Sequence, residues 1–358
     1  MKIIKNRNLF ILAFSLVVVT LGFGLVMPII PFYMERLGAG GSEMGFLVAS
    51  YAVMRLIFGP IWGSLSDRIG RKPILAVGVF GYGITMVGFG LATKLWMMFL
   101  ARILAGILSS ATSPTTMAYI SDSTTEEQRG GGMGLMGASA GIGTIFGPAL
   151  GGLLAERSLS TPFFAAAGMS LLALLLILIF LPESGRREQS SLEDQKGRLH
   201  PTALWQAITS PIGPLLLKAF LATGGVMVFY GILGLYALER LGYGTDRVGV
   251  IFTILGLVTA LGQGLLVGPL TKRFGDPWVV RWGFLTSAVC LLFTPLAGNF
   301  LEILLAVGLI SACTSVLIPS ITSLTSKRST ISQGVAMGLS NSFVSLGRIF
   351  GPLIGGLA

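Results

Sequence analysis

Apolar blocks of about twenty or more residues recur along the whole chain, and short loops rich in glycine, proline and charge separate them. A helix of about 20 apolar residues crosses the hydrocarbon core of a membrane. Only 11% of the 358 residues are charged and 53% are hydrophobic, whereas roughly 25% of an ordinary soluble domain is charged. So few charges cannot cover a soluble globule of this size. The blocks therefore predict an all-helical integral membrane protein and exclude a soluble enzyme.

The chain divides into eleven predicted spans and one long polar stretch. That stretch, 183–210, lies between the sixth and seventh spans and contains the only histidine, His200. We interpret it as a cytoplasmic linker between an N-terminal half, 1–182, and a C-terminal half, 211–358. The eleven spans are predicted at 9–34, 43–64, 73–93, 95–120, 131–155, 161–181, 211–237, 247–271, 277–298, 301–325 and 333–358.

The lysines and arginines predict an orientation. With a cytoplasmic N-terminus, sixteen of the 25 basic residues fall in inner loops, five in outer loops and four within spans. Because basic residues concentrate on the cytoplasmic side of membrane proteins, we predict a multi-pass protein of the plasma membrane whose N-terminus is cytoplasmic. The same topology accounts for the net charge of +10, so we expect no nucleic-acid partner.

The two halves contain an internal repeat. At an offset of 204 residues, the sequence ERLG at 35–38 recurs at 239–242, and Gly147-Pro148 recurs at 351–352. At an offset of 205, Gly63, Arg68 and Gly70 align with a glycine, an arginine and a glycine. Two homologous halves of six spans are implied, an architecture that places a substrate site near the membrane midplane between the halves.

The repeat also predicts a twelfth span, but the sequence stops at Ala358. Either the sequence is a fragment or the natural protein ends there, and the sequence leaves both alternatives open.

The inner loop between the second and third spans contains a dense motif, GSLSDRIGRK at 63–72. Here the sequence resembles the major facilitator superfamily, whose signature G-x-L-a-D-r-x-G-r-k it meets at every fixed position. We interpret the motif as a latch of the inner gate, in which Asp67 accepts hydrogen bonds from basic neighbours and from a helix N-terminus in the other half. Gly63 and Gly70 would permit close approach and a tight turn. A solvated loop whose charges only determine topology is the alternative.

The loop after the fourth span adds two residues to this predicted latch. Its members are Gly63, Asp67, Arg68, Gly70, Arg71, Lys72, Asp122 and Arg129. In the second half, Lys272 stands at the position that corresponds to Asp67, so we expect only one intact latch.

Glycines recur at four-residue spacing in the fifth span and clear one helix face for a neighbouring backbone. The segment resembles the motif of the antiporter branch of the same superfamily, where it lies at the interface of the halves and helps to seal the inner side. Ordinary packing of small residues is the alternative. The residues concerned are Gly143, Gly147, Pro148, Gly151 and Gly152.

Arg102 stands inside the fourth span, where a charge costs ~2.5 kcal/mol or more unless it faces a cavity or a partner. It matches the arginine motif of the fourth helix in this superfamily, and the resemblance implies a role in proton or substrate coupling. The alternative is that its side chain reaches the outer surface.

The acidic residues all fall in loops or at span ends, whereas many related exporters keep a carboxylate in the central cavity. Tyr230 and Ser315 stand roughly where those exporters have acids. The charges within the spans are basic: Arg55, Arg102, Lys218 and Arg348. We expect Lys218 to be a surface anchor, and Arg55, Arg348 and Tyr230 to be cavity candidates. Such a cavity would favour neutral, zwitterionic or anionic amphiphiles.

The resemblance implies a major facilitator type fold of two pseudo-symmetric six-helix halves, here with eleven spans. We expect a secondary transporter that exports a small amphipathic drug by alternating access, driven by the proton gradient and without a cofactor or metal. Its expected partners are the substrate and membrane lipid, and we expect a monomer. A major facilitator carrier of a metabolite, sugar or lipid is one alternative, and a channel or receptor another. No nucleotide-binding G-x-x-x-x-G-K-S/T signature occurs, which argues against direct ATP drive.

Overall fold

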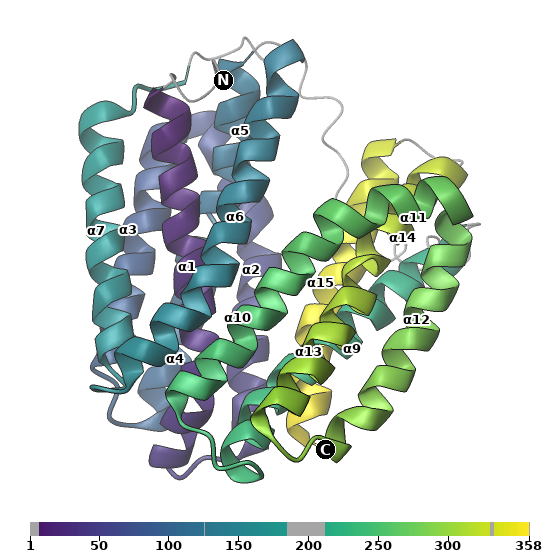
Figure 1. Ribbon diagram of the computed structural model, residues 1–358. Helices are drawn as coiled ribbons and strands as arrows, with labels where there is room; N and C mark the ends of the chain where they lie inside the picture. Colours follow the sequence, from purple (N-terminus) through teal and green to yellow (C-terminus); the bar gives the residue numbers. More distant parts are fainter. Residues whose placement is uncertain (1–6, 125, 185–211, 330–332, 358) are drawn as a thin grey trace. The chain divides into compact units, whose positions relative to one another are not determined.

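The computed structural model describes residues 7–124, 126–184, 212–329 and 333–357, with the side chains of 126–129 and 333–334 excepted. The predicted linker, 183–210, and His200 within it lie outside the described residues, apart from Glu183 and Ser184. All secondary structure in the described part is helical (Figure 1). The elements are α1 (Arg7–Arg36), α2 (Gly41–Ile69), α3 (Arg71–Gly90), α4 (Leu95–Ser109), α5 (Thr112–Ser123), α6 (Glu126–Ala155), α7 (Thr161–Phe180), α9 (Gly213–Glu239), α10 (Thr245–Leu261), the π-helix η2 (Gly262–Leu266), α11 (Val267–Phe274), α12 (Asp276–Phe293), the 3₁₀ turn η3 (Thr294–Leu296), α13 (Phe300–Ser315), α14 (Leu317–Arg328) and α15 (Gln333–Leu357).

Ten helical stretches of the described chain are long and apolar enough to cross a membrane, and they match the first ten predicted spans. Helix α15 has 25 residues and occupies the range of the eleventh. It is not among the ten, because polar residues such as Asn341 and Arg348 make it less hydrophobic. The prediction of an all-α membrane protein is confirmed.

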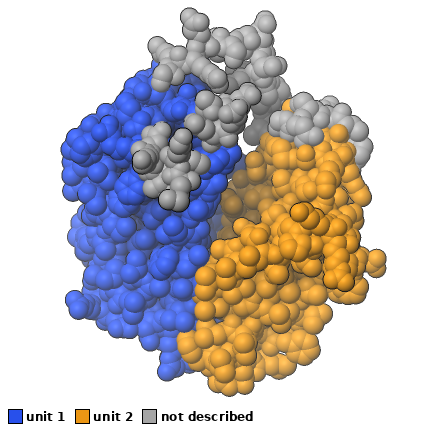
Figure 2. Space-filling view, turned by 45° about the horizontal axis from the view of Figure 1, so that its top comes forward, with its two compact units in different colours: residues 1–188, 234–253 blue, residues 189–233, 254–358 orange. Residues whose placement is uncertain are grey.

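The chain forms two compact units (Figure 2). Unit 1 contains residues 1–188 and 234–253, and unit 2 contains residues 189–233 and 254–358. The core of unit 1 gathers buried side chains from α1, α3, α5, α6 and α7. In unit 2, side chains of α9, α12 and α14 form a buried cluster. The end of α9 and the start of α10 therefore group with the first half of the sequence, and the predicted domain boundaries stay a prediction.

Two spans are broken at equivalent positions of the repeat. Helix α4 gives way to α5 around Ala111, and α13 gives way to α14 at Val316. A proline follows each break, Pro114 in α5 and Pro319 in α14. Proline lacks an amide proton, and its ring clashes with the carbonyl four residues earlier. A proline therefore explains each break, and the two prolines are related by the same 205-residue offset.

Helices α1 and α6 pack with their backbones in direct contact, side by side in Figure 1. A Cβ atom on Gly147 would lie 2.5 Å from the Leu21 carbonyl oxygen and 2.8 Å from the Gly24 Cα. A Cβ on Gly151 would lie 2.8 Å from the Leu25 carbonyl oxygen, and one on Gly143 would clash with α1 as well. The predicted glycine face of the fifth span is therefore a helix contact surface that admits no side chain.

Unit 2 repeats this packing between α9 and α15. Cβ atoms on Gly347 and Gly351 would lie 2.8 Å and 2.6 Å from backbone atoms of Gly224, and one on Gly355 would lie 3.1 Å from the Val228 carbonyl oxygen. These glycines are displaced by 204 residues from Gly143, Gly147 and Gly151. The repeat found in the sequence is therefore also a repeat of helix packing.

We predict that Gly147→Ala lowers the free energy of unfolding by about 1–3 kcal/mol, because the added methyl group overpacks against the backbone of α1. The measurement is thermal unfolding of the detergent-purified protein. Gly141→Ala is the matched control on the same helix, since a Cβ there meets no atom within 4 Å. Equal losses for both variants would contradict the assigned helix contact.

Candidate gate and buried arginine site

Arg71 is the centre of the predicted latch. Its Nη1 lies 2.6 Å from the Asp67 Oδ1, and its Nε lies 2.9 Å from the Asp122 Oδ2. Nη1 also donates to the Ser66 hydroxyl at 2.7 Å. The Arg71 side chain is only 13% exposed, so the guanidinium of these charge-assisted bonds is largely shielded from water. One guanidinium thereby joins the end of α2, the start of α3 and the end of α5.

Glu183 is a further member of this cluster that sequence reasoning did not assign. Its Oε1 accepts hydrogen bonds from the backbone amides of Arg71 at 2.6 Å and Lys72 at 3.2 Å. Amides at the start of a helix have no carbonyl partner within it, and a carboxylate is favourable there. Gly70 precedes them with φ +116°, a conformation that favours glycine. The only signal for Glu183 in the sequence was an acid that follows Leu181-Pro182. Its partners, the amides of Arg71 and Lys72, lie more than a hundred residues earlier in the chain.

The remaining latch candidates have mixed outcomes. Gly70 has the positive φ of a tight turn. Within unit 1 a Cβ on Gly63 would meet only the Pro114 Cβ at 3.9 Å, so the close approach expected at Gly63 stays a prediction. The Lys72 Nζ donates to the Leu178 carbonyl oxygen at 2.9 Å. Arg68 is exposed at the end of α2. The Arg129 side chain lies outside the described residues.

Arg102 is buried in unit 1, with 2% of its surface exposed. Its guanidinium carbon lies 4.8 Å from the centroid of the Tyr51 ring and 5.9 Å from that of Phe23. Cation–π attraction of this kind is stronger when the cation is desolvated. The side chain does not reach the surface, so the structure does not support the alternative of an outer-surface anchor.

Polar atoms remain available around Arg102. Its Nε and Nη2 atoms, and the hydroxyl of Tyr82, are buried without a hydrogen-bond partner among the described residues. Buried polar groups normally have such partners, and an unpaired one costs free energy. The site can therefore bind an acceptor atom of a water molecule or of a ligand.

The Tyr51 hydroxyl extends this polar site. It lies 3.3 Å from the Ser109 hydroxyl, and Arg55 donates to it at 3.4 Å. Arg55 itself is exposed. The structure therefore brings Arg55 and Arg102, two of the basic span residues, to the same tyrosine.

The other cavity candidates lie in unit 2. Arg348 is exposed on α15 beside the buried Gly347. Tyr230 is partly buried on α9 and interacts with Thr259 of α10. Ser315 is buried, and its hydroxyl would clash with a Cβ on Gly262 at the start of η2. Single turns of π-helix occur frequently at functional sites, and η2 was not predicted from the sequence.

The antiporter-type glycine segment makes a second close contact. A Cβ on Gly152 would lie 2.5 Å from the Thr245 carbonyl oxygen and 3.0 Å from the Gly249 Cα, and the Pro148 carbonyl oxygen would lie 2.7 Å from a Cβ on Gly249. This contact joins the last turns of α6 to the first turns of α10. This close approach lies at the end of α6 remote from the Arg71 cluster, and the expected seal on the inner side stays a prediction.

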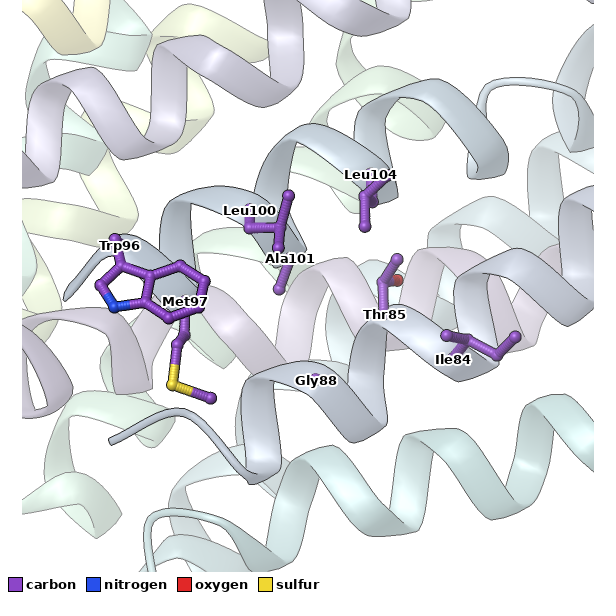
Figure 3. A pocket seen from close by; sticks show the side chains of 8 residues that line it. All are labelled: Ile84, Thr85, Gly88, Trp96, Met97, Leu100, Ala101 and Leu104. Carbon is purple, nitrogen blue, oxygen red and sulfur yellow. The ribbon is translucent and has the colours of Figure 1, made fainter. Parts of the chain in front are cut away.

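A shallow apolar groove of about 180 Å³ lies between α3 and α4 (Figure 3). Trp96, Met97 and Leu100 of α4 face Ile84 and Gly88 of α3 across it. None of the charged candidates lines it, so the groove suits an apolar group. Among the described residues, no group of three His, Cys, Asp or Glu side chains could hold a metal ion.

The sequence matches a known family along nearly its whole length. The family model described as Major Facilitator Superfamily matches residues 12–263 and 215–358. The chain belongs to the major facilitator superfamily. Members of this superfamily are transporters and not enzymes.

Two relatives of this major facilitator protein are bacterial resistance proteins. Multidrug resistance protein 1 of Bacillus subtilis (strain 168) is 31% identical over 358 residues, which cover 99% of this chain and 90% of the relative. Quinolone resistance protein NorA of Staphylococcus aureus is 28% identical over 351 residues, which cover 98% of this chain and 89% of the relative.

A solved structure confirms the fold. A bacterial homologue of the human lysosomal transporter Spinster superimposes with a TM-score of 0.83 at 16% identity, over 99% of this chain and 82% of the other. The predicted major facilitator fold is therefore confirmed, and the chain is a multi-pass membrane protein.

We predict that Arg71→Lys lowers the free energy of unfolding by about 1–3 kcal/mol, because one ammonium cannot reproduce the planar guanidinium that bridges Asp67 and Asp122. Thermal unfolding in detergent measures the loss. Arg157→Lys is the control, since Arg157 is exposed after the end of α6. An Arg71→Lys protein as stable as this control would show that Arg71 does not hold the three helix ends together.

Proposed function

We propose that this transporter exports a small amphipathic drug from the cell in exchange for protons, by alternating access of a central site across the plasma membrane. The observation that carries the proposal is the likeness to multidrug and quinolone resistance proteins at 28–31% identity along 98–99% of the chain. The driving force is the proton gradient, and the chain acts as a monomer without a cofactor. The N-terminus is cytoplasmic, which places the Arg71 cluster at the inner side.

The Arg71 cluster supports a gate that responds to protons. Two carboxylates share one guanidinium, and the Asp67 side chain is 42% exposed whereas that of Asp122 is 21% exposed. Loss of the charge on Asp67, the more exposed of the two, leaves Arg71 with Asp122 as its remaining ionic partner in the cluster. Because Coulomb energies are large where water is partly excluded, this change loosens the hold of Arg71 on the end of α2.

Arg102 supports a coupling role at depth in the membrane. A buried charge that retains unpaired donors is costly and gains most from an acceptor that comes and goes during transport. In the proposed cycle, Arg102 binds such an acceptor together with Tyr82. Tyr51 keeps the guanidinium in place while the acceptor is absent.

The distribution of charge supports a substrate that is not a simple cation. Every described Asp and Glu lies in a loop or in the first or last turns of a helix. The charge buried within the spans of unit 1 is that of Arg102. Coulomb attraction therefore favours neutral, zwitterionic or anionic amphiphiles over organic cations.

We predict that a drug added to energised inside-out vesicles releases part of the proton gradient, and that Asp67→Asn abolishes this release. The neutral amide keeps the shape of Asp67 but neither binds a proton nor pairs with Arg71 as an ion. A pH-sensitive dye measures the gradient, and the size of dye recovery on addition of drug is compared between the proteins.

Glu156→Gln is the control for this experiment. Glu156 is an exposed acid just after the end of α6 and has no part in the gate. It should leave the dye recovery unchanged. If no compound causes recovery with a folded protein, the drug-export proposal is wrong and a metabolite, sugar or lipid carrier becomes the better account.

We predict that zwitterionic quinolones and organic anions give larger dye recovery than ethidium at equal concentration. Arg102→Gln should reduce the preference for anions by about fivefold or more, because it removes the buried positive charge. The same vesicles and dye measure both proteins. A strong response to ethidium with none to anions would contradict the assigned charge preference.

A further inference from the structure

The 205-residue offset relates two ion pairs whose charges are reversed. In unit 1, the Arg71 Nε lies 2.9 Å from the Asp122 Oδ2. In unit 2, the Asp276 Oδ2 lies 2.6 Å from the Lys327 Nζ. Position 276 corresponds to 71 and position 327 to 122, so the acid and the base have exchanged places. The sequence comparison aligned Lys272 with Asp67 and so missed this second tie.

The two ties lie in the same structural setting. Asp276 is the first residue of α12 and follows Gly275 at φ +81°, as Arg71 is the first residue of α3 and follows Gly70 at φ +116°. Lys327 lies in the last turn of α14, as Asp122 lies in the last turn of α5. Each tie therefore joins the start of one helix to the end of another, on α12 and α14 in unit 2 (Figure 1).

The reversal changes how each tie interacts with its helices. A helix start carries partial positive charge and a helix end partial negative charge. Asp276 at a start and Lys327 at an end are both favourable, and Asp276 also accepts a hydrogen bond from Ser323 at 3.0 Å. Arg71 at a start and Asp122 at an end are both unfavourable. Unit 1 supplies two further acids near that start, Asp67 and Glu183, which offset the unfavourable placement.

The two ties also differ in burial of the acid. The Asp276 side chain is 6% exposed, whereas that of Lys327 is 67% exposed. Separation from Lys327 would leave a buried carboxylate without its ionic partner and with the Ser323 hydroxyl as its side-chain donor, which is unfavourable. Asp67 and Asp122 are 42% and 21% exposed and keep access to water when Arg71 moves. Opening of the first tie is therefore the less costly of the two.

We propose that Asp276–Lys327 is a permanent clamp that stays closed throughout the transport cycle, and that of these two ties only the Arg71 tie opens. The proposal rests on the proposed alternating access. It gives the two homologous halves different tasks: α12 and α14 move as one body, whereas α3 and α5 exchange partners.

The test measures conformational populations without any drug. Spin labels are attached to cysteines at Ile69 and Phe274, which are exposed positions related by the same offset, after Cys290→Ser and Cys313→Ser. Pulsed electron paramagnetic resonance then gives the distance populations in lipid nanodiscs, and thermal unfolding gives stability. Asp122→Asn should change the ratio of populations about fivefold or more.

Lys327→Gln should lower the unfolding midpoint by at least about 2 °C and leave the population ratio within about twofold of the parent protein. Lys327→Arg keeps the charge and should restore stability. If Lys327→Gln does not fold, Asp276→Asn combined with Lys327→Gln removes both charges and serves in its place. A clamp variant that shifts the populations as strongly as Asp122→Asn would overturn the proposal.

The exchanged pair, Asp276→Lys with Lys327→Asp, tests the physical reason. Both charges then oppose their helix ends, so the ion pair should recover only part of the stability lost in Lys327→Gln. Full recovery would show that the helix ends do not matter. Because these readouts need no substrate, a failure of drug-driven proton release alone would overturn the proposed function and leave the clamp standing.

Discussion

Hydrocarbon offers no water to pair with backbone amides and carbonyls, so a chain that crosses a membrane must satisfy these groups within its own helices. This constraint explains why the described secondary structure is helical throughout. The cost of a charge in hydrocarbon explains why most charged residues gather at helix ends. Hydrocarbon also limits how helices associate, because lipid tails are as apolar as leucine. The glycine faces of α6 and α15 meet this limit by letting backbones touch, at Gly147 against Leu21 and at Gly351 against Gly224.

Charges at helix ends take on a structural task as a result. In unit 1 a single guanidinium, that of Arg71, joins three helix ends through Asp67 and Asp122, and Glu183 binds the free amides beside it. In unit 2 the corresponding tie is Asp276 with Lys327. The first tie works against the partial charges of its helices and the second with them. Two halves with the same packing therefore differ in how easily their ends separate.

Arg102 is a buried exception to the placement of charges at helix ends. It is 2% exposed in the interior of unit 1 and is held by the faces of Tyr51 and Phe23. Aromatic rings stabilise a cation without using its hydrogen-bond donors, so the guanidinium keeps donors for an incoming acceptor. A site of this kind suits a transporter, because an acceptor that binds there can leave again without breaking the stacking.

The sequence by itself determined the all-α membrane architecture, the first ten spans and the glycine contact faces, because these depend on local hydrophobicity and on spacing within one helix. It also identified Asp67, Arg71 and Asp122 through a local motif and the loop after the fourth span. Only the tertiary structure decided that Arg71 is the centre of that cluster, that Glu183 joins it and that Gly152 approaches α10. Each of these depends on which distant helix ends meet. The Asp276–Lys327 pair was present in the repeat, but two residues of opposite charge that lie 51 positions apart become a tie only when folding brings the start of α12 to the end of α14.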